Sequence, residues 1–99
     1  MFNVYHEFVF DERSQYWDVI EGSEYNLLFV RGTMRYCTDE MRSLGYIYLN
    51  DIYEKFGVAW NPNDDNVCYT MTNSLGYLFS YQELPNNEGF KICVGREVG

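Results

Sequence analysis

The side chains that would support catalysis in this 99-residue chain are few and far apart in the sequence. His6 is the one histidine, and a serine or cysteine nucleophile would need it as a base within hydrogen-bond distance. Nothing in the sequence brings His6 to Cys37, Cys68 or Cys93, so we interpret it as a structural or surface histidine. The cysteines are odd in number and lack C-x-x-C spacing, which favours small buried side chains in a reducing compartment over disulfides or zinc ligation.

Acidic and amide side chains offer the other candidate chemistry. "NPNDDN" at residues 61–66 places oxygen ligands at alternate positions, as a calcium loop does, but its sixth position lacks glycine and Thr72 replaces the bidentate glutamate. We therefore predict a turn there. Adjacent carboxylates are usually solvated surface groups, and the sequence holds no phosphate-binding glycine motif. We predict a protein that is not an enzyme and that uses no metal or cofactor.

The charge balance restricts the classes of partner. Fifteen acids stand against seven bases, which gives a net charge of −8. This excess opposes direct binding to nucleic acid or to an anionic membrane, because both depend on Lys and Arg. It fits either plain solubility or attachment to a basic protein surface. Ten tyrosines are too many for so small a chain to bury, so some are expected to face solvent or a partner.

Alternating and helical patterns predict the elements that position these groups. Residues 2–10 alternate as a strand, with His6 and Phe10 on one face. Residues 11–22 are predicted as a short helix or turn. Residues 24–31 are predicted as a second strand, although their continuous apolar block also fits a buried helix.

Capping residues mark the ends of the next elements. Residues 33–44 are predicted to form a helix capped by Thr33, because apolar residues recur there at intervals of three and four. Residues 46–49 are predicted as a short strand, followed by a helix that begins at the N-cap Asn50 and ends at Gly57. Further strands are expected at residues 67–71, 77–83 and 90–94, separated by turns at residues 72–76 and 84–89.

This order of elements indicates one α+β domain over residues 1–99, with a mostly antiparallel sheet and two or three short helices. The first residues have no basic region followed by a long apolar run, so no signal peptide is expected. No segment approaches the ~20 apolar residues of a membrane span. We therefore expect a cytoplasmic protein.

The segment "GYIYLNDIYEKFGV" at residues 45–58 resembles a recurring segment of small uncharacterised proteins from Gram-positive phages and mobile elements. The matching positions are Gly45, Tyr46, Ile47, Leu49, Asn50, Asp51, Ile52, Tyr53, Glu54, Gly57 and Val58. "DDNVCYT" at residues 64–70 and "GYLFS" at residues 76–80 resemble a loop and a strand that follow in that family, with Tyr69 where the family has Trp. The resemblance implies a phage or mobile-element origin in a bacterial host, and it brings no catalytic residue.

Size, charge, tyrosine content and this resemblance together favour an inhibitor that binds a host defence complex, as anti-CRISPR proteins do. Its carboxylates would act as a nucleic-acid mimic on a basic surface, such as that of a CRISPR effector, and its tyrosines would slow release. The candidate contact residues are Asp11, Glu12, Asp39, Glu40, Asp51, Glu54, Asp64, Asp65, Tyr46, Tyr48 and Tyr53. The alternatives are a phage structural or accessory protein that self-assembles and a small enzyme that uses His6. We expect a monomer or small homo-oligomer that itself binds neither nucleic acid nor a membrane.

Overall fold

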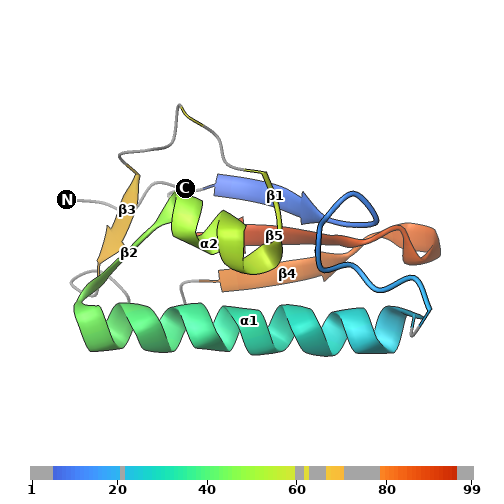
Figure 1. The fold of residues 1–99 in the computed structure, drawn as a ribbon, viewed down its shortest axis with the longest axis horizontal. Helices are drawn as coiled ribbons and strands as arrows, with labels where there is room; N and C mark the ends of the chain where they lie inside the picture. The colour runs from blue at the N-terminus through green and yellow to red at the C-terminus, as the bar shows by residue number, and fades with distance from the viewer. Residues whose placement is uncertain (1–5, 21, 60–61, 63–66, 71–78, 96–99) are drawn as a thin grey trace.

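A three-stranded antiparallel sheet and one long helix form the frame of the molecule (Figure 1). The computed structural model describes residues 6–20, 22–59, 62, 67–70 and 79–95. Its elements in chain order are β1 (His6–Phe10), α1 (Gly22–Leu44), β2 (Tyr46–Tyr48), α2 (Leu49–Phe56), β3 (Cys68–Thr70), β4 (Phe79–Glu83), the 3-10 turn η3 (Pro85–Asn87) and β5 (Phe90–Val94). Two helices beside antiparallel strands make an α+β fold, as the sequence predicts.

β5 lies in the middle of the larger sheet, whose strand order is β1-β5-β4. Both neighbours run antiparallel to β5, and Phe10 pairs with Phe90 in the β1–β5 register. Within residues 6–10, His6, Phe8 and Phe10 share the more buried face, which confirms the predicted alternation. β5 has the predicted bounds, and a second, two-stranded sheet pairs β2 with β3.

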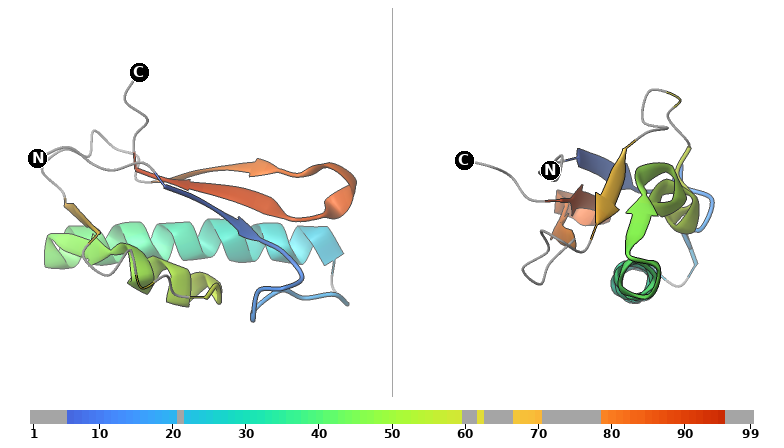
Figure 2. Two further views of the ribbon diagram at one scale, coloured as in Figure 1. Left: turned by 90° about the horizontal axis from the view of Figure 1, so that it is seen from above. Right: turned by 90° about the vertical axis from the view of Figure 1, so that its left-hand side faces the viewer.

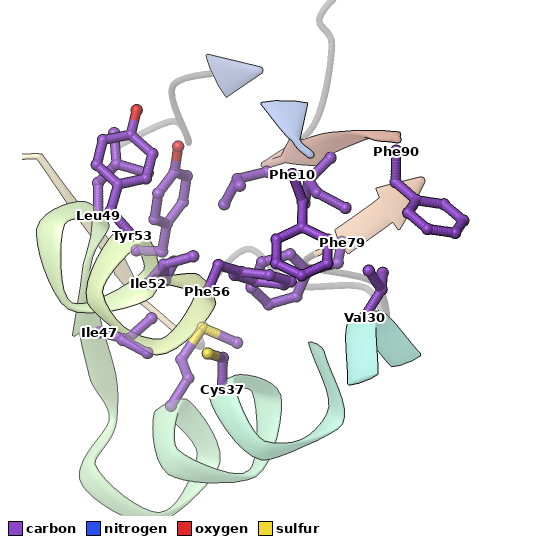
Figure 3. Close-up of a cluster of buried hydrophobic side chains, with 14 residues drawn as sticks. Phe10, Val30, Cys37, Ile47, Leu49, Ile52, Tyr53, Phe56, Phe79 and Phe90 are labelled. Atoms are coloured by element: carbon purple, nitrogen blue, oxygen red, sulfur yellow. The ribbon is translucent and has the colours of Figure 1, made fainter. Parts of the chain in front are cut away.

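The sheet, α1 and α2 surround one apolar core. The end-on view in Figure 2 shows the sheet on one side, α2 on the other and α1 along the base. Phe10 stacks on Phe29 of α1 with 5.2 Å between ring centroids, and Phe56 of α2 meets Phe29 edge-on. Figure 3 shows Phe10, Phe56 and Phe79 converging from β1, α2 and β4. All three layers therefore contribute aromatic rings to the same centre.

Residues 22–44 form one helix of 23 residues, which corrects two predictions. The strand predicted at residues 24–31 and the cap predicted at Thr33 both lie inside α1, and the helical alternative for the apolar block is the one observed. The helix is favoured because one side of it is buried along its length, through Asn26, Val30, Cys37 and Met41. α1 is therefore longer than the short helices that the sequence predicts.

The segment between β1 and α1 forms turns rather than a helix. Ser14 N–H donates to the Asp11 carbonyl at 2.8 Å, and Gln15 N–H donates to the Gly57 carbonyl at 2.9 Å. The second bond joins this segment to the end of α2. Its amides are thus directed to a distant partner, which prevents a continuous helix.

α2 begins earlier than predicted, and Asn50 is not its cap. The N-cap is Tyr48, which makes no side-chain capping bond, and Asn50 lies buried inside the helix. The Leu49 N–H at the start of the helix donates to the Val67 carbonyl at 3.0 Å. A backbone acceptor beside β3 therefore satisfies an amide that would otherwise need a side-chain cap.

Gly57 ends α2 as predicted. Its φ of 72° is left-handed, and its N–H donates to the Glu54 carbonyl at 3.0 Å. A Cβ at this position would lie 2.8 Å from Cδ2 of Tyr16. Both the backbone conformation and the close contact with the turn before α1 therefore require glycine.

Candidate protein-interaction site

Two of the predicted acids, Asp11 and Glu12, lie on a hydrogen-bonded turn directly after β1. Asp11 N–H donates to the Ser14 hydroxyl at 3.2 Å, in addition to the bond from Ser14 N–H to the Asp11 carbonyl. Arg13 folds back over the turn: its Nη2 donates to Asp11 Oδ2 at 2.8 Å and its backbone N–H donates to Oδ1 at 3.0 Å. The backbone of this acidic turn is therefore fixed by its own hydrogen bonds.

The Asp11–Arg13 pair sets the charge state of the turn. The hydrogen bond from the Arg13 side chain is the main cause that lowers the pKa of Asp11, so this carboxylate is ionised over a wider pH range than usual. The same contact raises the pKa of Arg13. The Arg13 side chain is 82% exposed, so the pair contributes little to folding stability.

A glycine brings the turn between β4 and β5 against this loop. Gly89 has a φ of 143°, and a Cβ there would lie 2.6 Å from the Phe10 carbonyl oxygen and 2.9 Å from Asp11 Cβ. Only glycine permits this approach. Figure 1 shows the end of β1 and the β4–β5 turn at the same end of the molecule.

An open pocket of about 520 Å³ lies between these two turns. We call it the acidic pocket, and its lining residues are Asp11, Glu12, Arg13, Trp17, Asn86 and Glu88. Three carboxylates and one guanidinium give it a net charge of −2 when all four groups are ionised. Trp17 provides an aromatic wall that packs against Phe10, with 5.4 Å between ring centroids. Carboxylates beside an indole ring suit a cationic side chain such as that of Arg or Lys.

Two and three residues after Trp17, two aliphatic side chains face solvent. Val19 is 76% exposed and Ile20 is 89% exposed, and we call this pair the apolar tip. Single exposed apolar residues are ordinary, but two exposed β-branched neighbours that closely follow a pocket residue in the chain are a candidate contact feature.

The buried side chain of Asn26 holds the backbone of the apolar tip in place. Its Oδ1 accepts from Asp18 N–H at 2.9 Å, and its Nδ2 donates to the Asp18 carbonyl at 2.9 Å and the Gly22 carbonyl at 3.0 Å. Asp18 Oδ1 in turn accepts from Ile20 N–H at 2.9 Å. The tip is therefore preorganised by α1, and less conformational freedom is lost when it contacts a partner.

The predicted acids of the helices do not join this pocket. Asp39 and Glu40 lie on α1 and Asp51 and Glu54 on α2, and none of the four lines the acidic pocket. The predicted contact residues Asp64 and Asp65 lie outside the described residues. The structure thus brings together Asp11 and Glu12 but not all of the acids that the sequence proposes.

The three candidate tyrosines have different surroundings. Tyr46 and Tyr48 are exposed on β2, and their rings meet edge-on with 5.6 Å between centroids. Tyr53 is only 6% exposed and packs against Phe8 with 5.1 Å between centroids. Tyr53 therefore belongs to the core, whereas Tyr46 and Tyr48 remain available at the surface.

The contacts and burial of His6 and of the cysteines are those of residues that support the fold. His6 Nδ1 lies 2.9 Å from the hydroxyl of Tyr69, which connects β1 to β3. Cys37, Cys68 and Cys93 are free thiols, and Cys37 and Cys93 are buried. Burial, followed by the negative charge of Glu40, raises the pKa of Cys37 to about 12. The neutral thiol that results is a poor nucleophile.

No protein family, curated protein or solved structure matches the chain. Among the described residues, no three His, Cys, Asp or Glu side chains are grouped so that they would hold a metal ion. In the same part of the chain, no helix has the length and apolar character needed to cross a membrane.

Sequence reasoning missed Trp17, Asn86 and Glu88 as pocket residues. Trp17 stands in a segment predicted as a short helix or turn, and the other two stand in the predicted turn at residues 84–89. The pairing of the first and last strands could have indicated these residues. β1 and β5 are antiparallel, so the end of β1 lies beside the start of β5. Glu88 precedes β5 and Asp11 follows β1, so that register alone places them close together.

Proposed function

We propose that the chain is a non-enzymatic protein of phage or mobile-element origin that binds and inhibits a host defence complex with a basic nucleic-acid-binding surface. The acidic pocket is the observation that carries the proposal. It joins carboxylates to an aromatic wall on a chain whose net charge is −8. The partner is a cytoplasmic bacterial protein, such as a CRISPR effector, and the mode of action is anti-CRISPR-like mimicry of nucleic acid.

The proposed contact begins with a Lys or Arg side chain of the partner entering the acidic pocket. Glu12 and Glu88 are exposed, and no described cation lies within ion-pair distance of either carboxylate. Within the described residues, these acceptors therefore form no ion pair, while Trp17 offers its ring to the alkyl or guanidinium part of the side chain. In this way the pocket occupies a Lys or Arg side chain with which the partner normally binds phosphate.

The apolar tip supplies the second half of the contact. Charge complementarity accelerates encounter, whereas burial of aliphatic side chains slows dissociation. Val19 and Ile20 stand two and three residues after Trp17, so a partner that fills the pocket is expected to meet the tip as well. The proposed partner surface is a basic group beside an apolar cleft.

Two charge-reversed variants test which acids act. The pocket variant carries Glu12→Lys and Glu88→Lys, and the matched control carries Asp51→Lys and Glu54→Lys on α2, with the same change in net charge. Tagged proteins are used to capture the partner from the bacterial host, and nucleic-acid binding by the purified partner is measured with each variant. The wild type and the α2 variant are expected to displace nucleic acid, and the pocket variant is not. The association rate of the wild type should fall steeply between ~0.05 and ~0.5 M salt.

Some outcomes would contradict the pocket as the contact site, and others would contradict the inhibitor function itself. Equal loss in both variants means that overall charge and not the pocket is responsible. Loss in the α2 variant alone moves the contact to Asp51 and Glu54. Tight binding of the purified chain to DNA or RNA, or capture of only the chain itself and virion components, removes the inhibitor proposal.

The alternative function is a phage structural or accessory protein that self-assembles. The observation that favours it is the exposed side of α1, which carries Tyr25, Leu28 and Tyr36. A large ring or polymer in a solution mass measurement supports this function, and a monomer or small closed oligomer supports the inhibitor.

A further inference from the structure

The centre of α1 holds a glycine that the fold itself does not need. Gly32 is exposed, has no left-handed φ, and a Cβ built on it would meet nothing within 4 Å. Glycine inside a helix costs about 1 kcal/mol relative to alanine. A use that offsets this cost is the close approach of a second backbone, because glycine has no side chain to hold it away.

Apolar side chains surround Gly32 on the exposed side of α1. Residues three and four apart lie on one helix face, so Tyr25, Leu28, Gly32 and Tyr36 form a line, which we call the α1 stripe. Leu28 is 66% exposed, and Tyr25 and Tyr36 are each about half exposed. Figure 2 shows α1 with the sheet and α2 on its other sides. Lys55 of α2 reaches the Tyr36 ring, with its Nζ 5.3 Å from the ring centroid, while Leu28 stays largely open to solvent.

The charge of α1 indicates what kind of surface covers the stripe. α1 carries three arginines, Arg31, Arg35 and Arg42, against three acids, Glu24, Asp39 and Glu40. The helix is therefore neutral, and the rest of the chain carries the whole net charge of −8. Two copies that meet through α1 do not bring their acidic surfaces together. Pairing through other faces of the molecule would do so.

We propose that two copies of the chain pair through antiparallel α1 helices, about a two-fold axis beside Gly32. In an antiparallel pair centred on residue 32, a residue a given number of positions before 32 lies opposite the residue of the second copy that is the same number of positions after 32. Leu28 thus lies opposite Tyr36 of the second copy, and Tyr25 lies opposite Asp39 of the second copy, within reach of a hydroxyl–carboxylate hydrogen bond. The contact is isologous, so it closes at two copies.

The ends of the helix pair are matched by charge. Glu24 and Arg42 are eighteen residues apart, about five turns, so they lie on the same flank of α1. In the antiparallel pair, Glu24 of one copy and Arg42 of the other differ by only about 3 Å along the helix axis. Each dimer therefore forms this ion pair twice. By the same geometry, Arg31 and Arg35 of both copies meet on this flank beside the two-fold axis, where they are exposed and where salt screens their mutual repulsion.

The contact area sets the expected strength. A helix of 23 residues is about 34 Å long, and one helix pair buries less surface than a standard interface of ~1,600 Å². The dimer should therefore be weak and reversible. Sedimentation equilibrium from ~10 µM to ~1 mM covers the range expected for such small interfaces.

Substitution of Gly32 is expected to stabilise the monomer and to weaken the dimer. Gly32→Leu should raise the thermal midpoint of the monomer, because leucine favours the helix and nothing inside the fold obstructs it. It should also shift the dimer dissociation constant upward by at least tenfold. A rise in stability with unchanged dimerisation overturns the proposal, and so does a wild type that stays monomeric at ~1 mM, beyond the range of small interfaces.

A matched leucine pair and a charge swap test the register. Leu28→Ser should weaken the dimer, whereas Leu44→Ser should not, because Leu44 is similarly exposed on the same helix but lies outside the stripe. Glu24→Arg and Arg42→Glu should each weaken the dimer, and the double variant should restore it. A double variant as weak as the single ones rules out this antiparallel register, and equal effects of both leucine substitutions rule out the stripe.

Discussion

Asn26 and Asn50 show how strongly distant segments decide the role of a single residue. Asn50 stands where an N-cap is expected, yet it is buried inside α2 because the Val67 carbonyl accepts the Leu49 amide. Asn26 gives no local signal, yet its side chain makes three hydrogen bonds to the backbone of Asp18 and Gly22. The role of Asn50 is decided by Val67, which is distant in the sequence, and two of the three Asn26 bonds go to Asp18, which lies outside α1.

Replacement of Asn26 by alanine should destabilise the protein by about 2–3 kcal/mol, because three hydrogen bonds at about 1 kcal/mol each are lost from a buried site. Urea unfolding measures this change. Gln82→Ala, which removes an exposed amide from β4, is the control and should stay within about 0.5 kcal/mol of wild type. Hydrogen exchange of the Asp18 amide should also accelerate, and unchanged exchange would show that Asn26 does not hold the tip.

Cys37 should make the protein sensitive to alkaline pH. The pKa of its thiol is about 12 in the folded protein and near 9.0 in the unfolded chain, so the neutral thiol is favoured in the folded state. This stabilisation is complete below about pH 9 and is lost as the pH rises through about 12. The unfolding free energy of wild type should therefore fall faster than that of Cys37→Ala between pH 7 and 10.5. A constant difference in unfolding free energy between the two proteins over this pH range would contradict the buried thiol.

At the scale of elements, strands were easier to predict than the longest helix. β1 alternates with a period of two, and its more buried face makes that pattern visible in the sequence. β5 is the central strand and is buried at four of its five residues, so it appears as a short apolar run. The sequence predicts a strand and a separate helix where α1 lies, because residues 27–30 are continuously apolar and Gly32 resembles a break. What joins the parts is burial against the sheet and α2, which is a tertiary effect that overrides local propensity.

Two glycines allow the cost of a left-handed backbone to be separated from the cost of a close contact. Gly45 and Gly57 have φ values of 87° and 72°, but only at Gly57 would a Cβ clash, 2.8 Å from the Tyr16 ring. Gly45→Ala should cost about 1–2 kcal/mol, from backbone strain alone. Gly57→Ala should cost clearly more in the same urea measurement. Equal costs would mean that the contact between α2 and the turn before α1 is easily relaxed.

At the scale of the whole molecule, the candidate site depends on one long-range contact. Asp11 and Glu12 were identified from the sequence as part of a larger set of acids, but the pocket exists only because Gly89 lies against the end of β1. No local pattern reports that approach. Trp17 and Glu88 therefore become site residues through topology, while Asp39 and Asp51 are separated from them by the same topology.

The fold should be independent of disulfides and metal ions. All three cysteines are free thiols, and apolar packing of the sheet and two helices supplies the core. Addition of a reductant or a chelator should leave the thermal midpoint within about 2 °C, which is well under the change that removal of a stabilising disulfide or bound metal produces. Calorimetry with each reagent in turn checks this, and a loss of many degrees with either would show that a crosslink or ion supports the fold.

The central place of β5 has a consequence for the order in which the molecule is made. Both β1 and β4 pair with β5, and neither pairs with the other. β5 is also the last described element to leave the ribosome, so the nascent chain has no larger sheet until translation has passed residue 94. Until then the apolar side of α1 and the rings of β1 have no sheet to cover them, which exposes them to chaperones and to aggregation. Ribosome-stalled chains that stop before residue 90 should therefore be protease-sensitive throughout, and protection should appear in one step once β5 has emerged.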